Sequence, residues 1–211
     1  LLEKAQRWDD LTSLLEQEAA SEQDLETKIS LERKLAKLQE DKRHDLVAAG
    51  DAWSRISRLT PDDEFAVQTA AKLYERAERP DLAVQVISDS TPHIEDPMAR
   101  GTLLQRLGEL REALGDIEAA GDSFSDAADA QKNPKLWEEA ERVYVAAEKW
   151  DKAAHSATQR SLFTSDTKQQ AANLARASEY LTRAGDDDAA LASLEEATDL
   201  DPVNDDFAAL L

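Results

Sequence analysis

The sequence predicts an all-α fold, a stack of antiparallel helix pairs with about six pairs and no β-sheet. The first observation behind this prediction is composition: aromatic residues make up only 5% of the 211 residues, and there are only 6 glycines and 6 prolines. Alanine and leucine are abundant, which favours helices over strands. The second observation is an internal repeat, and the third is the placement of helix-starting residues at the same period.

The repeat has two levels. Segments of the first set lie 72 and 70 residues apart: Leu2–Asp9, Tyr74–Asp81 and Tyr144–Asp151. Segments of the second set lie 71 and 70 residues apart: Ala49–Trp53, Ala120–Phe124 and Ala190–Leu194. Two alternating units of about 35 residues therefore form a superrepeat of about 70 residues. Stacked supersecondary units show such a period, whereas a single compact core has no reason to show it.

Helix-starting signals recur at the same spacing. Four pairs place a capping side chain before a proline, which is the combination that opens a helix: Thr60-Pro61, Asp96-Pro97, Asn133-Pro134 and Asp201-Pro202. An acid marks the turn inside each unit, at intervals of 35 or 36 residues: Asp10, Asp45, Asp81, Asp116, Asp151 and Asp186. An acid at the start of the second helix suits the positive end of the helix dipole.

These signals and the apolar spacing predict the individual helices. They are expected near residues 1–7, 9–20, 23–42, 45–59, 63–78, 81–90, 96–114, 116–131, 134–148, 150–163, 166–184, 186–200 and 203–211. We expect residues 1–211 to form one continuous array, a fragment of a longer protein because the pattern starts and stops in mid-helix. The predicted units are about 1–20, 21–61, 62–94, 95–132, 133–164 and 165–202, with the next unit starting at 203–211.

The repeats resemble tetratricopeptide repeats. Residues 104–127 have most of that signature: Leu104, Leu107, Gly108, Gly115, Ala120, Phe124 and Ala127. Further matches are Gly185, Ala190, Leu194, Ala197 and Pro202, and Ala49, Trp53, Ile56 and Pro61. The odd-numbered units match poorly, since they lack the turn glycine and have Trp8, Pro80 or Trp150 at the turn. The resemblance, which extends to large bacterial repeat proteins, implies a right-handed α-α superhelix and protein-binding partners.

Charge narrows the class of partner. The net charge is −20, of which residues 1–60 contribute −3 and residues 61–211 contribute −17. An acidic surface repels phosphate backbones, so nucleic acid is not an expected partner, and basic proteins are favoured. Solubility alone would also explain the acidity. No apolar run approaches the length of about 20 residues that spans a bilayer, so no membrane insertion is expected. The compartment is left open, as the chain contains no cysteine.

No catalytic, cofactor or metal site is predicted. The three histidines, His44, His93 and His155, match no zinc spacing. Gly101, Gly108 and Gly115 recur every seven residues, which indicates close helix packing rather than a phosphate loop. The acids at 186–188 and at 199–206 lack the order of a calcium-binding loop and are read as helix caps. Nor does the chain contain a serine in a nucleophile elbow, so we expect no enzyme activity.

The resemblance also implies a binding groove lined by the first helix of each unit. Family positions carried onto this sequence give the candidate partner-binding residues Lys34, Tyr74, Thr102, Gln105, Glu109, Glu112, Trp137, Tyr144, Glu179, Thr182 and Arg183. Trp137 and Tyr144 also fit an apolar stripe, so core packing is the competing interpretation for them. For the polar candidates the competing interpretation is an ordinary solvated face.

Two functions follow as hypotheses. The chain is expected to act as a non-catalytic scaffold that holds a peptide segment or a folded partner through the solenoid surface. The alternative is a structural spacer within a large assembly, stacked against further repeats of the same chain.

Overall fold

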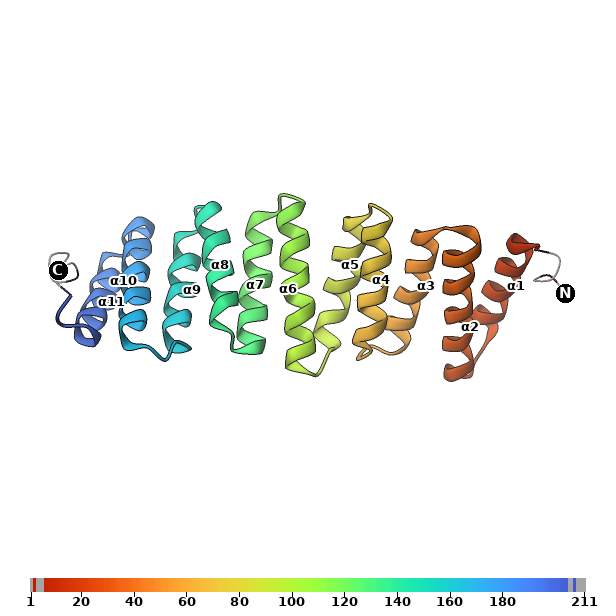
Figure 1. The fold of residues 1–211 in the computed structure, drawn as a ribbon, viewed down its shortest axis with the longest axis horizontal. Coiled ribbons are helices and arrows are strands. Elements are labelled where there is room, and N and C mark those ends of the chain that lie inside the picture. The colour runs from red at the N-terminus through yellow and green to blue at the C-terminus, as the bar shows by residue number, and fades with distance from the viewer. Residues whose placement is uncertain (1, 3–5, 205–206, 208–211) are drawn as a thin grey trace. The chain divides into compact units, whose positions relative to one another are not determined.

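In the computed structural model, the described residues are residue 2, residues 6–204 and residue 207. They form helices joined by short turns and no strand. The chain divides into two compact units, Leu1–Leu103 and Leu104–Leu211. Figure 1 shows that within each unit successive helices run in alternate directions and pack side by side. The predicted all-α fold of stacked helix pairs is confirmed for these residues.

The first unit contains five complete helices and the start of a sixth. They are α1 (Trp8–Ser21), α2 (Leu25–Leu38), α3 (Leu46–Leu59), α4 (Glu64–Arg76), α5 (Pro80–Ser90) and the first residues of α6 (Pro97–Ala113). A π-helical turn, Gln39–Arg43, extends α2, and a 3-10 turn, Thr91–His93, follows α5. The predicted bounds agree with these helices to within about two residues at most ends.

The second unit begins inside α6. It continues with α7 (Ile117–Gln131), α8 (Pro134–Ala146), α9 (Trp150–Leu162), α10 (Thr167–Ala184) and α11 (Asp187–Leu200). The helices expected at residues 1–7 and 203–211 lie largely outside the described residues. None of the described helices has the length and apolar character needed to cross a membrane.

Two of the four predicted proline starts are confirmed. The Asn133 carboxylamide accepts a hydrogen bond from the Lys135 backbone N–H at 3.1 Å, and the Asp96 carboxylate accepts one from Ala99 at 3.2 Å. The prediction for Thr60-Pro61 is wrong, because Thr60 ends α3 and the cap of α4 is Asp63. Likewise Asp201 ends α11. A threonine or aspartate before proline can close one helix as well as open the next.

The acids in the turns behave differently in the two types of unit. Asp45, Asp116 and Asp186 occupy the N-cap positions of α3, α7 and α11. Asp81 and Asp151 instead lie inside the first turn of their helices. In both places a carboxylate lies at the positive end of the helix dipole.

Close helix packing depends on two glycines, each paired with a tyrosine from the next helix pair. A Cβ atom built on Gly50 would lie 2.7 Å from the Tyr74 ring, and one built on Gly121 would lie 2.6 Å from the Tyr144 ring. The residue after each glycine accepts the hydroxyl proton: Tyr74 donates to Asp51 and Tyr144 to Asp122, both at 2.7 Å. We name each set a Gly–Asp–Tyr latch. Because the ring needs the space of the missing side chain, this pairing occurs once per superrepeat.

The interpretation of Gly101, Gly108 and Gly115 holds only in part. A Cβ on Gly108 would lie 2.9 Å from the Phe124 ring, so this glycine does allow close packing. Gly115 has a φ of +83° with no atom within 4 Å of a built Cβ, so it ends α6 in the left-handed conformation rather than packing against another helix.

Candidate protein-binding face

The candidate residues lie on the first helices of the pairs, which are α2, α4, α6, α8 and α10. The structure separates them into buried aromatic side chains and polar side chains that are exposed or half-buried. Tyr74 and Tyr144 are each 4% exposed and Trp137 is 3% exposed. Core packing, the competing interpretation for Trp137 and Tyr144, is the arrangement found, and both tyrosines belong to the latches.

All three tyrosines of the chain have a raised pKa. Burial is the main cause for Tyr74 and Tyr144, and the acceptor carboxylates of Asp51 and Asp122 add to it by disfavouring a second negative charge. Burial and the carboxylate of Glu141 raise the pKa of Tyr180 to about 12. These hydroxyls therefore act as hydrogen-bond donors and not as proton acceptors in the neutral range.

The polar candidates on α6 are already engaged with neighbouring side chains. Arg142 of α8 forms a two-pronged ion pair with Glu112, with N–O distances of 2.7 and 2.8 Å. This guanidinium lowers the pKa of Glu112, and the carboxylate in turn raises the pKa of Arg142. Glu109 pairs with Arg106 at 2.5 Å and accepts from Gln105 at 3.3 Å. Thr102 donates to the backbone of its own helix.

The α10 candidates differ in how strongly they are held. The guanidinium carbon of Arg183 lies 4.8 Å from the centre of the Trp150 ring, close enough for a cation–π contact. Thr182 donates to the Ser178 carbonyl at 3.0 Å. Glu179 is exposed on the same helix. In the first unit, Lys34 lines a cavity of about 290 Å³ beside Trp8, Leu15 and Lys37.

Ion pairs connect successive first helices. Arg76 of α4 contacts Glu40, at the end of α2, at 2.6 Å in the first unit. In the second unit Arg142 of α8 contacts Glu112 of α6, and Arg176 of α10 contacts Glu141 of α8 at 3.2 Å. The first-helix face therefore holds cross-links between neighbouring pairs as well as side chains that point to solvent.

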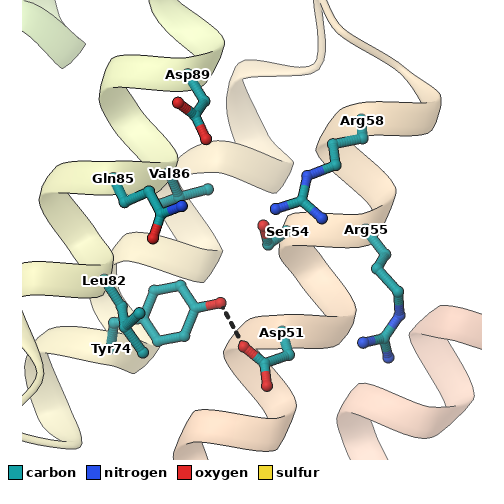
Figure 2. Close-up of a pocket in the computed structure, with 9 residues that line it drawn as sticks. All are labelled: Asp51, Ser54, Arg55, Arg58, Tyr74, Leu82, Gln85, Val86 and Asp89. Atoms are coloured by element: carbon teal, nitrogen blue, oxygen red, sulfur yellow. Dashed lines mark hydrogen bonds between the residues drawn. The ribbon is translucent and has the colours of Figure 1, made fainter.

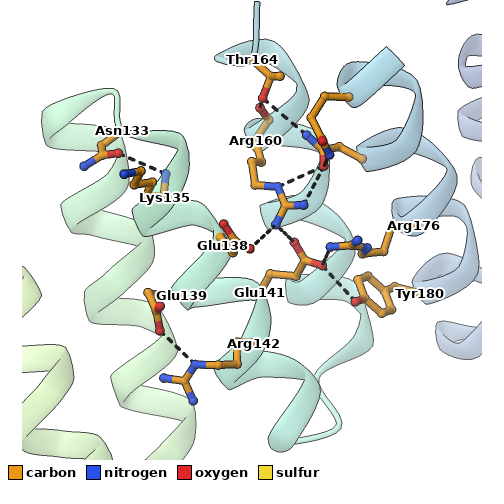
Figure 3. A network of polar contacts seen from close by, with 12 residues as sticks. Asn133, Lys135, Glu138, Glu139, Glu141, Arg142, Arg160, Thr164, Arg176 and Tyr180 are labelled. Atoms are coloured by element: carbon orange, nitrogen blue, oxygen red, sulfur yellow. Dashed lines mark hydrogen bonds and ion pairs between the residues drawn. The ribbon is translucent and has the colours of Figure 1, made fainter. Parts of the chain in front are cut away.

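A buried polar network joins α8, α9 and α10 (Figure 3). Arg160, 7% exposed, donates to Glu141 at 2.9 Å and to the fully buried Asn173 at 2.7 Å. Glu141 also accepts from Tyr180 at 3.0 Å. Sequence reasoning missed this network. A signal was present, because the residues 70 positions earlier are Ala71, Ser90 and Leu103; polar residues that replace small and apolar ones in a repeat indicate a local interaction.

Metal chemistry finds no support in the described part of the chain. There, no three His, Cys, Asp or Glu side chains are grouped so that they could hold a metal ion. His155, the only histidine with a ring contact among the described residues, packs edge-on against Trp137 with ring centres 5.7 Å apart.

The helix pairs, the alternating turns and the small-residue contacts define the class of protein: a tetratricopeptide-like helix-pair repeat. Each described pair has two antiparallel helices of 11 to 18 residues, and small residues such as Gly108 and Ala120 lie where helices meet.

Comparison with known proteins gives similar folds at low identity. The chain is similar to the crystal structure of MamA, with 14% identity, a TM-score of 0.44, and 82% of this chain and 92% of that chain covered. BtubC from P. vanneervenii has 16% identity and a TM-score of 0.42 over 96% and 90% of the two chains. YrrB, described as a TPR protein with an unusual peptide-binding site, has 16% identity and a TM-score of 0.42 over 85% and 90%.

No protein-family model matches the sequence, and neither does any curated protein.

Proposed function

We propose that the chain is a non-catalytic scaffold that binds a peptide segment or a folded protein through its first-helix face. One observation supports this most directly. The first helices present exposed polar side chains that the fold does not need for its core, including Lys34, Glu109 and Glu179. Surface side chains repeated along an array of helix pairs suit recognition of an extended or helical segment.

The burial of the aromatic candidates shifts the proposed contacts toward charge and hydrogen bonding. With Tyr74, Trp137 and Tyr144 in the core, a partner would meet the carboxylates and ammonium groups around them. Most of these groups are acidic, and a basic partner would be drawn to them at low salt.

Site-specific photo-crosslinking in cells tests this proposal. A photoreactive residue at Glu109 or Glu179 should trap the same protein, while one at Glu196, exposed on the second helix α11, should trap none. Glu179→Lys should reduce that crosslink and leave the helical circular dichroism signal unchanged. Glu112 is a poor site for charge reversal, because the change would also break the ion pair with Arg142.

The spacer alternative predicts the opposite pattern. Crosslinks would then come from Glu196 and not from Glu109 or Glu179, and Glu179→Lys would leave association unchanged. That result would overturn binding through the first-helix face.

A further inference from the structure

A cavity of about 210 Å³ lies among α3, α4 and α5 of the first unit, away from every candidate residue except Tyr74. Figure 2 shows it between the two second helices, α3 and α5, with the Tyr74 latch at its lower edge. We call it the α3–α5 pocket. The residues that line it are Asp51, Ser54, Arg55, Arg58, Tyr74, Leu82, Gln85, Val86 and Asp89.

The second latch shows what fills the corresponding place in the other unit. There the Lys152 ammonium lies 2.7 Å from Asp122, 3.1 Å from Glu118 and 5.4 Å from the centre of the Tyr144 ring. The residue 70 positions before Lys152 is Leu82, which has no charge. The first latch therefore has no side chain that reaches across it as Lys152 does.

The charges around the α3–α5 pocket balance. Two guanidinium groups, Arg55 and Arg58, face two carboxylates, Asp51 and Asp89. Arg55 is paired with Glu32 at 2.9 Å, and Asp51 accepts the Tyr74 hydroxyl proton. In the latch of the second unit, the positions of Arg55 and Arg58 are occupied by Asp126 and Asp129. An isolated cation or anion thus gains little from the α3–α5 pocket, because each would meet like charges.

Two charged groups of the pocket have no such engagement. Within the described residues, Arg58 and Asp89 form no ion pair and no side-chain hydrogen bond, and the Gln85 amide is likewise unbonded. Figure 2 shows the Arg58 guanidinium and the Asp89 carboxylate both directed toward the pocket, with Gln85 between them and Val86 behind. The pocket thus offers one strong donor and one strong acceptor beside an apolar wall.

A neutral carboxamide is the group that matches this arrangement. Its oxygen can accept from a guanidinium, its NH₂ can donate to a carboxylate, and it brings no net charge. We propose that the α3–α5 pocket binds the side-chain carboxamide of a glutamine or asparagine on a protein partner, held between Arg58 and Asp89, with its methylene stem against Leu82 and Val86. This rests on the proposed scaffold function and adds a second contact, on the opposite helices of the pairs.

NMR titration of the isotope-labelled full chain tests the proposal with three capped residues of similar size. The probes are the N-acetyl, N-methylamide derivatives of glutamine, glutamate and lysine. The glutamine probe alone should shift the side-chain signals of Arg58 and Gln85. Arg58→Ala and Asp89→Ala should each weaken its binding about fivefold, the loss expected for one hydrogen bond. Asp129→Ala, the matching position in the second unit, should leave binding unchanged.

Other outcomes would overturn the proposal. Equal shifts with all three probes would mean that the pocket binds main-chain amides, which the probes share. Stronger binding of glutamate or lysine would mean that one charge dominates, and no shift would mean that the pocket binds none of them. The crosslinks from Glu109 and Glu179 are read separately, so loss of the pocket and loss of the scaffold function are distinguishable.

Discussion

At the scale of single residues, the latches explain why the repeat has a period of about 70 and not 35. A tyrosine ring can pack directly on a helix backbone only where glycine leaves room, at Gly50 and Gly121. In the latch the hydroxyl of that ring is satisfied by the aspartate next to the glycine. A buried phenol without an acceptor would be destabilising, so glycine, aspartate and tyrosine are needed together.

Gly121→Ala should destabilise the protein, although alanine is normally the better residue inside a helix. The helix preference would favour alanine by about 0.5–1 kcal/mol. The added methyl would meet the Tyr144 ring at 2.6 Å, and overpacking of this kind costs about 1–3 kcal/mol. Urea denaturation should therefore show a net loss. In a Tyr144→Leu background the same change should be neutral or stabilising; an equal loss there would rule out the ring as the cause.

The raised pKa values of the three tyrosines predict how stability changes in alkali. The unfolded chain ionises its phenols near pH 10, whereas the folded chain holds their protons to higher pH. Because the folded state then binds more protons than the unfolded state, the free energy of unfolding should fall as pH rises above 10. Absorbance at 295 nm should show tyrosinate near pH 10 in denaturant and not in buffer. Native ionisation near pH 10 would contradict the buried hydroxyls.

At the scale of helices and turns, sequence reasoning located the helices because their apolar spacing and caps agree with one another. It could not foresee how the odd-numbered units turn without glycine. Glu78 and Glu148 adopt the left-handed conformation, with φ of 58° and 55°, where Gly115 and Gly185 do so in the even-numbered units. The same backbone bond closes both kinds of turn, from Arg79 to Tyr74 and from Asp116 to Arg111, each at 2.9 Å. Packing of the flanking helices sets the turn, and a glutamate tolerates it at a cost of about 1 kcal/mol.

The candidate site was harder to predict than the helices. Family positions identify which helix bears a side chain, but burial depends on residues from other helices. Tyr74 could be recognised as a core residue only together with Gly50 and Asp51, which lie on the preceding helix. Glu112 likewise needs Arg142, 30 residues away, to show that it braces two helices.

The Arg160 network gives a prediction about how α8, α9 and α10 hold together. Arg160→Ala would leave Glu141 and Asn173 buried without their main partner, and such a change costs about 3–5 kcal/mol. Arg142→Ala removes an ion pair of a half-exposed arginine and should cost less than about 1 kcal/mol. Denaturant titrations of both variants measure the difference.

A triple variant separates loss of the network from loss of packing. Glu141→Ala, Arg160→Ser and Asn173→Leu introduce the residues found 70 positions earlier. Removing all the partners together should be less damaging than removing Arg160 alone, because no buried charge remains unpaired. A triple variant less stable than Arg160→Ala would mean that the network contributes more than the burial of its charges costs.

At the scale of the whole molecule, the superrepeat predicts which deletions the chain tolerates. Removing residues 63–132, which is 70 residues, joins α3 to α8 and places Tyr144 where Tyr74 was, opposite Gly50 and Asp51. Asn133 then caps the helix in place of Asp63. Since repeats are stabilised by their nearest neighbours, this shortened chain should keep its helicity per residue and unfold cooperatively. Circular dichroism at 222 nm during heating measures both.

Removing a single pair should not be equivalent. Deleting residues 63–95 joins α3 to α6 and, counted from the left-handed turn residues Glu78 and Gly115, places Arg111 where Tyr74 was. The space above Gly50 would then lack its ring, and the cavity left there would lower stability. This chain is longer than the first one, yet it should melt at a lower temperature. If it instead melted higher, the structural unit of the protein would be one helix pair, and the alternation of the two types would have no part in holding the stack together.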